Sequence, residues 1–518
     1  MRRCFAFLCG WLLVLTASGA TPELGKDALR KLVKLPTIIF DSNWTFDPER
    51  GFTLGSSAQD VSDEIARLRQ QSNHEPADAA VQLHIGDLLT SLNDIASAQK
   101  AYGRAAEFYR QRVDAQPGDA MLLCGFGRAL QGAGKTEEAE SVLRKAVDIA
   151  PNEWRCRVAL GRFLDADARH NIEDAGLSAS HVTLARKELA EASECYDHAS
   201  VIAPNEGEIY FRRGMHRSLR AMLLNEIRMS EGEQRDEVVG SSRQFSDAAL
   251  ADLQRASRLK PSDYALIGNV VLFEIYTGCS HNGQMDWGDF SWSSLPEKSQ
   301  HSIHDAETRL ENLGQVPDPR QASGALEVLG ILQGPILHDS RSCILNLRRA
   351  VALEPSRDQA WDVLAGTLAR MHLYDELLSV CQERIHQKES ARGHLLLAKA
   401  YEKLRQWDDS ENEIMESLRM APNSFTANLA EAALVLRRSQ DPDVLLDANS
   451  WLARSERLLN DLPPMQRNQE AIIELTLTRS IYFALSDQLD EARQWAKAVI
   501  NQDKNNPVAQ EILSAMDY

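Results

Sequence analysis

The chain has 518 residues, of which 43% are hydrophobic and 25% are charged, and its formal net charge is −18. This hydrophobic content is too high for a disordered chain and is typical of a folded protein. An acidic balance of this size argues against nucleic acid as the main ligand, because phosphate backbones are bound by clustered Lys and Arg. It also argues against adhesion to anionic lipid.

Residues 1–20 have the three parts of a secretory signal peptide. Arg2 and Arg3 are basic, residues 5–15 are apolar apart from one glycine, and residues 16–20 are small. The apolar run is shorter than the ~20 residues that a membrane-spanning helix needs. We therefore predict cleavage before Thr21 and export to the periplasm, the cell envelope or the extracellular space, with no membrane insertion afterwards. An uncleaved membrane anchor is the alternative.

Residues 21–75 precede the repeating part of the chain. Residues 35–40 are predicted to be extended, and residues 58–71 are predicted to form an amphipathic helix with Ile65 and Leu68 on its apolar face. We interpret this extension as a cap, which covers an apolar edge that a helical array would otherwise expose.

Residues 117–151 carry the clearest pattern of a helical hairpin. The pattern predicts a first helix over about 120–132, a glycine-rich turn, and a second helix that begins near Thr136 and ends before a proline. Gly127 and Ala139 are small, so we expect the two helices to approach closely at these positions.

The second helix contains a spacing that recurs along the chain. Ala139 is followed by Leu143 four residues later, by Ala146 after three more, and by Pro151 after five more. The recurrences are Ala192-Tyr196-Ala199-Pro204, Ala249-Leu253-Ala256-Pro261, Cys343-Leu347-Ala350-Pro355 and Ser410-Ile414-Ser417-Pro422. With the 34 residues between Pro117 and Pro151, this pattern resembles the tetratricopeptide repeat (TPR) family. The resemblance implies an all-α fold, a right-handed superhelical solenoid of TPR-like helical hairpins.

We predict that this array occupies residues 76–276 and 321–505 and ends in a capping helix over 506–518. Two spacings in the first part are longer than in the family, from Gly161 to Ala192 and from Gly214 to Ala249. We interpret both as extended pairs of helices.

Residues 277–320 lack the repeat pattern, so we predict an irregular insertion. Its aromatic residues either pack the insertion onto neighbouring helices, which we favour, or present anchors to a partner. These aromatic residues are Trp287, Phe290 and Trp292. The insertion also holds residue types that bind zinc, at a spacing that matches no standard site, so we expect no metal and no cofactor. These are Cys279, His281, His301, His304 and Asp305.

The six cysteines after the signal peptide are scattered and form no CxxC pair, so we predict buried free thiols. They are Cys124, Cys156, Cys195, Cys279, Cys343 and Cys381.

The family resemblance implies that the first helix of each hairpin lines a peptide-binding groove. Basic residues fall on predicted first helices at groove-facing spacing and could hold a carboxylate-bearing peptide. They are Arg128, Arg155, Arg162, Arg392 and Lys399. The pattern by which some family members clamp a terminal carboxylate is missing, because Leu83 and Asp87 stand where Lys and Asn would be.

No short enzyme motif occurs, neither a P-loop nor GxGxxG, HExxH or GxSxG. We therefore predict that the protein is not an enzyme but an exported scaffold or adaptor that binds a partner protein or peptide. One alternative is an accessory subunit of an enzyme complex, with a small metal or ligand site in residues 277–320. Another is a structural envelope protein that associates with itself.

Overall fold

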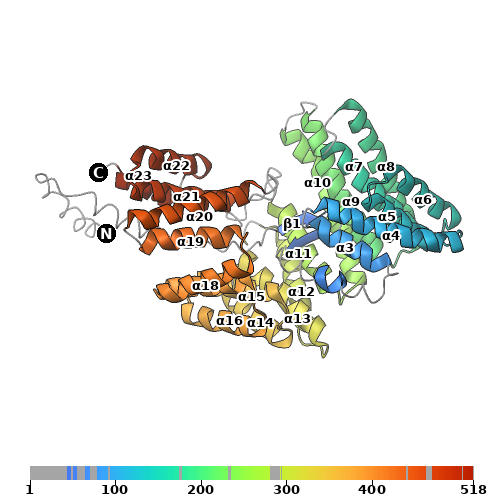
Figure 1. Cartoon of the computed structure of the whole chain (residues 1–518). Helices are drawn as coiled ribbons and strands as arrows, with labels where there is room; N and C mark the ends of the chain where they lie inside the picture. Colours follow the sequence, from blue (N-terminus) through green and yellow to red (C-terminus); the bar gives the residue numbers. More distant parts are fainter. Residues whose placement is uncertain are drawn as a thin grey trace, which may run out of the picture. The chain divides into compact units, whose positions relative to one another are not determined.

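The computed structural model describes residues 44–47, 51–54, 65–69, 79–91, 94–173, 178–230, 235–279, 292, 295–438, 441–461, 469–504 and 506–516. The chain divides into two compact units, each of which is considered by itself. One unit is Phe40–Thr367, and the other combines Met1–Ile39 with Leu368–Tyr518. In both units the described chain is almost entirely helical (Figure 1), so the predicted all-α solenoid is confirmed.

The unit Phe40–Thr367 begins with a short hairpin and continues as consecutive helices. Its elements are β1 (Trp44–Asp47), β2 (Gly51–Leu54), α3 (Ala79–Ser91), α4 (Ile95–Ala115), α5 (Ala120–Gly132), α6 (Thr136–Ile149), α7 (Trp154–Glu173), α8 (Ala179–Ile202), α9 (Gly207–Ser230), α10 (Arg235–Leu259), α11 (Tyr264–Cys279), α12 (Glu297–Leu313), α13 (Pro319–Ile331), the π-helix η3 (Leu332–Ile336), α14 (Ser340–Leu353) and most of α15 (Asp358–Arg370).

The α5–α6 hairpin follows the prediction from its sequence. Asp119 caps α5 by accepting hydrogen bonds from the backbone N–H groups of Met121 and Leu122, at 2.9 and 3.1 Å. Gly134 makes the turn with φ +78°, a conformation that favours glycine. At Gly127 a Cβ atom would lie 2.5 Å from Cγ of Leu143, so the close approach of the two helices requires glycine.

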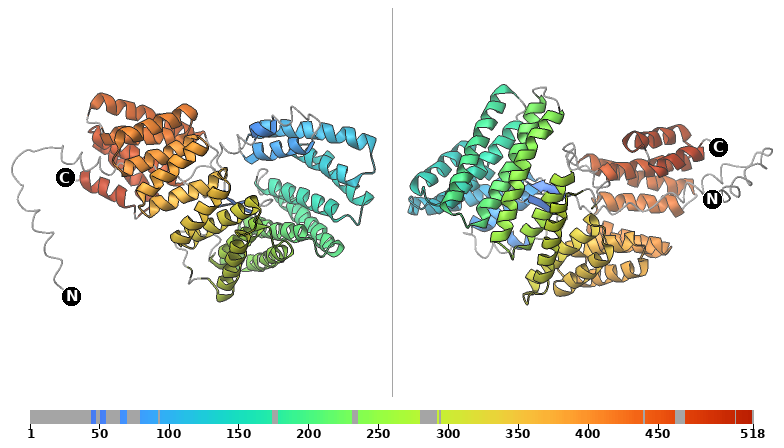
Figure 2. Two further views of the ribbon diagram at one scale, coloured as in Figure 1. Left: turned by 90° about the horizontal axis from the view of Figure 1, so that it is seen from below. Right: turned by 180° about the vertical axis from the view of Figure 1, so that it is seen from behind.

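The next two hairpins are longer, as the two wide spacings predicted. Helices α7 and α8 have 20 and 24 residues, and α9 and α10 have 24 and 25, against 13 and 14 in α5 and α6. Both pairs pack along their length, and the four helices stand side by side in Figures 1 and 2. The inserted residues therefore lengthen existing helices.

The N-terminal extension contacts two places in the same unit. Residues 65–69 are helical, and Ile65 and Leu68 are buried in the core that includes Val81 and Ile85 of α3. The strands β1 and β2 pair antiparallel, with Trp44 opposite Leu54, and β2 packs against α11. The predicted extended segment, residues 35–40, lies outside the described residues, as does the predicted signal peptide.

The prediction of an irregular segment over 277–320 is wrong for residues 297–313. These residues form α12, which buries Ile303, Ala306 and Leu310 at helical spacing in the same core as helices α11 and α13. The glycine, serine and tryptophan residues that precede this helix suggested a loop. Of the predicted aromatic cluster, Trp292 is 39% exposed, whereas Trp287 and Phe290 lie outside the described residues.

The second unit consists of helices in its described part, and the boundary with the first unit falls within α15. Its C-terminal helix buries Ala509 and Ile512 and packs against the two preceding helices. The helices are α16 (Tyr374–Gln387), α17 (Ala391–Lys403), α18 (Trp407–Met420), α19 (Phe425–Arg438), α20 (Pro442–Asn460), α21 (Gln469–Leu485), α22 (Leu489–Gln502) and α23 (Pro507–Met516).

Candidate functional site

The first helices of three successive hairpins surround a cavity of about 490 Å³ in the unit Phe40–Thr367. We name it the α3–α5–α7 hollow. Its main lining residues are Leu83, Asp87, Tyr102, Tyr109, Cys124, Gly125, Arg128, Gln131, Gly132, Arg155, Ala159, Arg162 and Ala166. The three arginines predicted on the first helices of this unit thus line one concave site, although whether they bind a partner stays a prediction.

Two tyrosines of α4 shape the hollow, and the sequence analysis did not identify them as part of the site. Tyr102 and Tyr109 are two turns apart, so they lie on the same face of the helix. Each ring packs where α5 has a glycine: a Cβ at Gly125 would lie 2.5 Å from the Tyr109 ring, and one at Gly132 would overlap the Tyr102 ring. The seven-residue spacing of the tyrosines, opposite two glycines, was the available signal.

Arg128 is paired within the hollow. Its Nη2 donates to Oδ2 of Asp87, and the other oxygen of Asp87 accepts a hydrogen bond from the Tyr102 hydroxyl at 2.8 Å. Burial raises the pKa of Tyr102, so the phenol stays protonated and keeps donating. Arg128 therefore supplies a positioned but largely neutralised charge.

Arg155 and Arg162 line the hollow from α7. The guanidinium of Arg155 lies 4.5 Å from the ring centroid of Trp154, pairs with Glu153 at 3.1 Å, and is half exposed. An exposed pair of this kind is weak and exchanges readily for another anion. Arg162 also lines a smaller adjoining pocket with Asp165. The predicted basic residues Arg128, Arg155 and Arg162 thus line the hollow, but neighbouring carboxylates offset part of their positive charge.

The other two predicted binding residues belong to the second unit. Arg392 and Lys399 lie on α17, and both are partly exposed. The same helix buries His394, whose Nδ1 lies 2.6 Å from a carboxylate oxygen of Glu413. A binding role for Arg392 and Lys399 stays a prediction.

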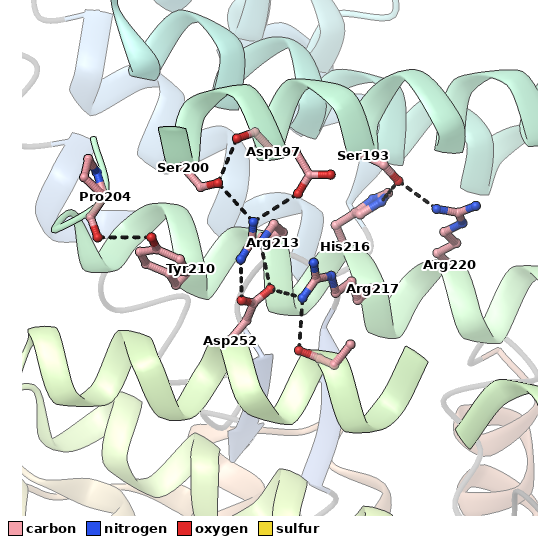
Figure 3. A network of polar contacts seen from close by, with 11 residues as sticks. Ser193, Asp197, Ser200, Pro204, Tyr210, Arg213, His216, Arg217, Arg220 and Asp252 are labelled. Carbon is pink, nitrogen blue, oxygen red and sulfur yellow. Dashed lines mark hydrogen bonds and ion pairs between the residues drawn. The ribbon is translucent and has the colours of Figure 1, made fainter. Parts of the chain in front are cut away.

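A polar network joins the extended hairpins (Figure 3). Asp252 of α10 is 6% exposed and accepts two hydrogen bonds from Arg213, at 2.7 and 2.8 Å, and one from Arg217 at 2.6 Å. Arg213 also pairs with Asp197 of α8 at 3.0 Å. Asp197 and the three arginines Arg213, Arg217 and Arg220 border a cavity of about 340 Å³. The network fastens α8, α9 and α10 together, and sequence spacing gave no indication of it.

A serine, a histidine and an aspartate are aligned beside this network. The Nε2 atom of His216 lies 2.7 Å from Oγ of Ser193, and its Nδ1 lies 2.6 Å from Oδ1 of Asp165. The order resembles a nucleophile with its base. However, the Ser193 hydroxyl donates to the carbonyl of Leu189 and accepts from Arg220, so its proton is directed away from His216. The chain of contacts therefore links α7, α8 and α9 and presents no activated nucleophile.

The residues of the predicted insertion whose types can bind zinc do not form a cluster in the part of the chain that the structure describes. His301 contacts the carbonyl of Glu297, its own helix neighbour, and His304 is 81% exposed. Among the described residues, no three His, Cys, Asp or Glu side chains are placed to hold a metal ion. His281 and the side chain of Cys279 lie outside that part of the chain.

In the part of the chain that the structure describes, no helix combines the length and apolar character needed to cross a membrane. In sequence, residues 77–152, which include α3 to α6, match the family model described as "Tetratricopeptide repeat". No curated protein matches the chain.

Several solved structures are similar to the chain. Yeast Tom70 matches 89% of this chain and 92% of its own, at 12% identity and a TM-score of 0.39. A tetratricopeptide repeat protein from Parabacteroides merdae matches 54% of this chain and 94% of its own, at 14% identity and 0.36. Pseudomonas aeruginosa PilF matches 42% of this chain and 91% of its own, at 13% identity and 0.31. With TM-scores below 0.5, these likenesses carry no argument about function.

Proposed function

We propose that this chain, whose residues 77–152 match the tetratricopeptide repeat family, is an extracytoplasmic scaffold or adaptor that binds a partner protein or peptide in the α3–α5–α7 hollow. The observation that carries the proposal is that two first helices, α5 with Arg128 and α7 with Arg155 and Arg162, direct these arginines to one concave surface.

The size and lining of the hollow suit a short peptide segment. A volume of about 490 Å³ is large enough for a few side chains. The tyrosine rings supply rigid apolar area, and Gln131 supplies an amide that can hydrogen-bond a peptide backbone. Arg155 and Arg162 supply forked donors that match a carboxylate, so we propose a partner segment with an acidic residue.

Support for an extracytoplasmic location comes from residues 1–20, with two arginines, an apolar run and small residues before Thr21. N-terminal sequencing of the protein recovered from its host envelope tests this. A mature terminus at Thr21 is expected, and a full-length chain in the cytosolic fraction would contradict export.

The binding proposal is tested by affinity capture from host envelope extract, with the chain from Thr21 as bait. A triple variant, Arg128→Glu, Arg155→Glu and Arg162→Glu, reverses the charge in the hollow. A double variant, Arg155→Glu and Arg162→Glu, keeps the Arg128–Asp87 pair. The matched control is Arg104→Glu with Lys145→Glu, two exposed positions outside the hollow in the same unit.

We expect both hollow variants to lose a partner that the control retains. A partner retained by all variants would place the binding surface elsewhere. Association of the bait with itself alone, seen by light scattering over a concentration series, would favour the self-associating envelope protein instead.

A further inference from the structure

Two cysteines from successive repeats meet beneath the α3–α5–α7 hollow. The sulfur atoms of Cys124 on α5 and Cys156 on α7 are 3.3 Å apart, although the residues are separated by 32 positions in sequence. Both side chains are buried, at 8% and 0% exposed. All five cysteines in the described part of the chain are buried, and none of them forms a disulfide.

The geometry lies close to that of a disulfide bond. A disulfide needs a sulfur–sulfur distance of about 2.05 Å, so the two sulfurs must approach by a little more than 1 Å. The buried cluster that holds the pair contains Ala120 and Ala146 as well as the larger Leu123. Rotation of the two cysteine side chains about their Cα–Cβ bonds moves the sulfur atoms towards each other.

An oxidant can reach one of the two sulfurs. Cys124 lines the α3–α5–α7 hollow, whereas Cys156 lies fully buried behind it. The Cys124 thiol donates to Cys156, and this hydrogen bond raises the pKa of Cys124 and lowers the pKa of Cys156. Thiolate character, and hence nucleophilicity, is therefore concentrated on the inner sulfur.

We infer that Cys124 and Cys156 are a redox-active pair that a small-molecule or protein disulfide oxidises to an intramolecular disulfide. The shared proton moves from Cys124 to Cys156, and the resulting Cys124 thiolate attacks the disulfide of the oxidant, forming a mixed disulfide and releasing a thiolate that takes up the proton from Cys156. The Cys156 thiolate then attacks Cys124 Sγ, which forms the new bond and releases the second thiol. The protein loses two hydrogen atoms, and the oxidant gains them as two thiols.

The expected effect is to fasten α5 to α7. These are the first helices of consecutive hairpins, and both line the hollow. A covalent link across 32 residues restricts the unfolded chain, so the oxidised form should unfold at a higher temperature, by roughly 5 °C. The inference concerns the thiol pair alone and does not depend on the proposed binding function.

The experiment incubates the purified, folded full chain with excess oxidised glutathione and follows it by intact mass and by peptide mapping without reduction. We expect a species lighter by two hydrogen atoms, a linked peptide containing Cys124 and Cys156, and the rise in melting temperature. Cys195, which is buried on α8, is an internal control that should stay reduced. Its pKa is raised by burial to about 11.

Two variants keep the test decisive. Cys156→Ala should stop at a glutathione adduct on Cys124, and Cys124→Ala should react at neither position. Circular dichroism checks that both variants are folded, and Cys→Ser versions replace any that are not. Persistence of both free thiols in the native wild-type chain, or a stable adduct on Cys124 although Cys156 is present, would overturn the inference.

Discussion

The regular hairpin α5–α6 and the extended hairpins α7–α8 and α9–α10 differ in what holds their helices together. In α5–α6 the contact is small and apolar, with Gly127 against Leu143. The extended hairpins keep this kind of contact, since Gly214 faces Leu253 in α9–α10. In addition they bury polar pairs, among them Arg213 with Asp252 and Asn171 with Glu188.

The two polar pairs lie at different levels of their hairpins. Arg213 and Asp252 are the sequence neighbours of Gly214 and Leu253, so this pair lies beside the glycine contact, whereas Asn171 and Glu188 lie in the additional turns of α7 and α8. Buried ion pairs are sensitive to the loss of either partner, because the remaining charge is left desolvated. Apolar contacts are sensitive instead to added volume. The two types of hairpin should therefore respond to different substitutions.

Asp252→Ala should give the largest effect. It leaves Arg213 and Arg217 without their shared buried carboxylate, and we expect α9 and α10 to lose about 3 kcal/mol of stability against opening. Hydrogen–deuterium exchange of amides in α9 and α10 measures this. Asp247→Ala, at an exposed position on the same helix, is the control and should leave exchange almost unchanged. Equal exchange in the two variants would mean that the network contributes little.

Gly127→Ala should destabilise the regular hairpin by about 1–3 kcal/mol, because the new methyl group would overlap Leu143. The matched control is Gly103→Ala in α4, where a Cβ meets no atom within 4 Å, and this change should be neutral or stabilising. Urea unfolding followed by circular dichroism measures both. Combining Gly127→Ala with Leu143→Ala should remove the clash, so additive losses would contradict this explanation.

Glu188→Gln should alter how stability depends on pH. Burial raises the pKa of Glu188 to about 7, above its usual value near 4.5, so the folded state binds a proton that the unfolded state releases between these values. The stabilisation that Glu188 gives to the folded state is thus fully present below about pH 4.5, and it is lost as pH rises through 7. Because glutamine does not titrate, the free energy of unfolding of the variant should fall by about 1–2 kcal/mol less than that of the wild type over this pH range. Melting temperatures from pH 5 to 8 test it, with the exposed Glu194→Gln as control.

Arg110→Ala should have the smallest effect. Arg110 and Glu138 form an ion pair at 3.5 Å between α4 and α6, with both side chains more than 40% exposed. Such pairs contribute less than about 0.5 kcal/mol. A double-mutant cycle with Glu138→Ala, read by urea unfolding, measures the coupling. A coupling above 1 kcal/mol would show that the packing of the regular hairpin on α4 also depends on charge.

Much of the fold was predictable because prolines, glycines and the 4-3-5 spacing are local signals. They placed α5 and α6 and anticipated the lengthening of α7 to α10. Helix α12 was missed although Ile303, Ala306 and Leu310 have helical spacing, because the preceding glycine, serine and tryptophan residues suggested a loop. The β1–β2 hairpin was also missed, although aromatic and β-branched residues stand on both sides of Pro48 in the sequence.

The candidate site was predictable in part for the same reason. Helical spacing placed Arg128, Arg155 and Arg162 on first helices, and they line one hollow. Their partners were not predictable, because Asp87 lies 41 residues from Arg128 and meets it only through packing of the hairpins. The Arg213–Asp252 pair could not be predicted for the same reason, because its residues are 39 positions apart and meet only through packing of the helices.

The contact of β2 with α11 has a consequence for biosynthesis. Nearly all other contacts of the array join neighbouring helices, so successive hairpins can fold as they leave the ribosome. The β1–β2 hairpin emerges early, yet its docking surface on α11 is translated roughly two hundred residues later. Until α11 has been synthesised, β2 lacks the helix against which it packs, so the β1–β2 hairpin is among the last of the described segments of this unit to dock.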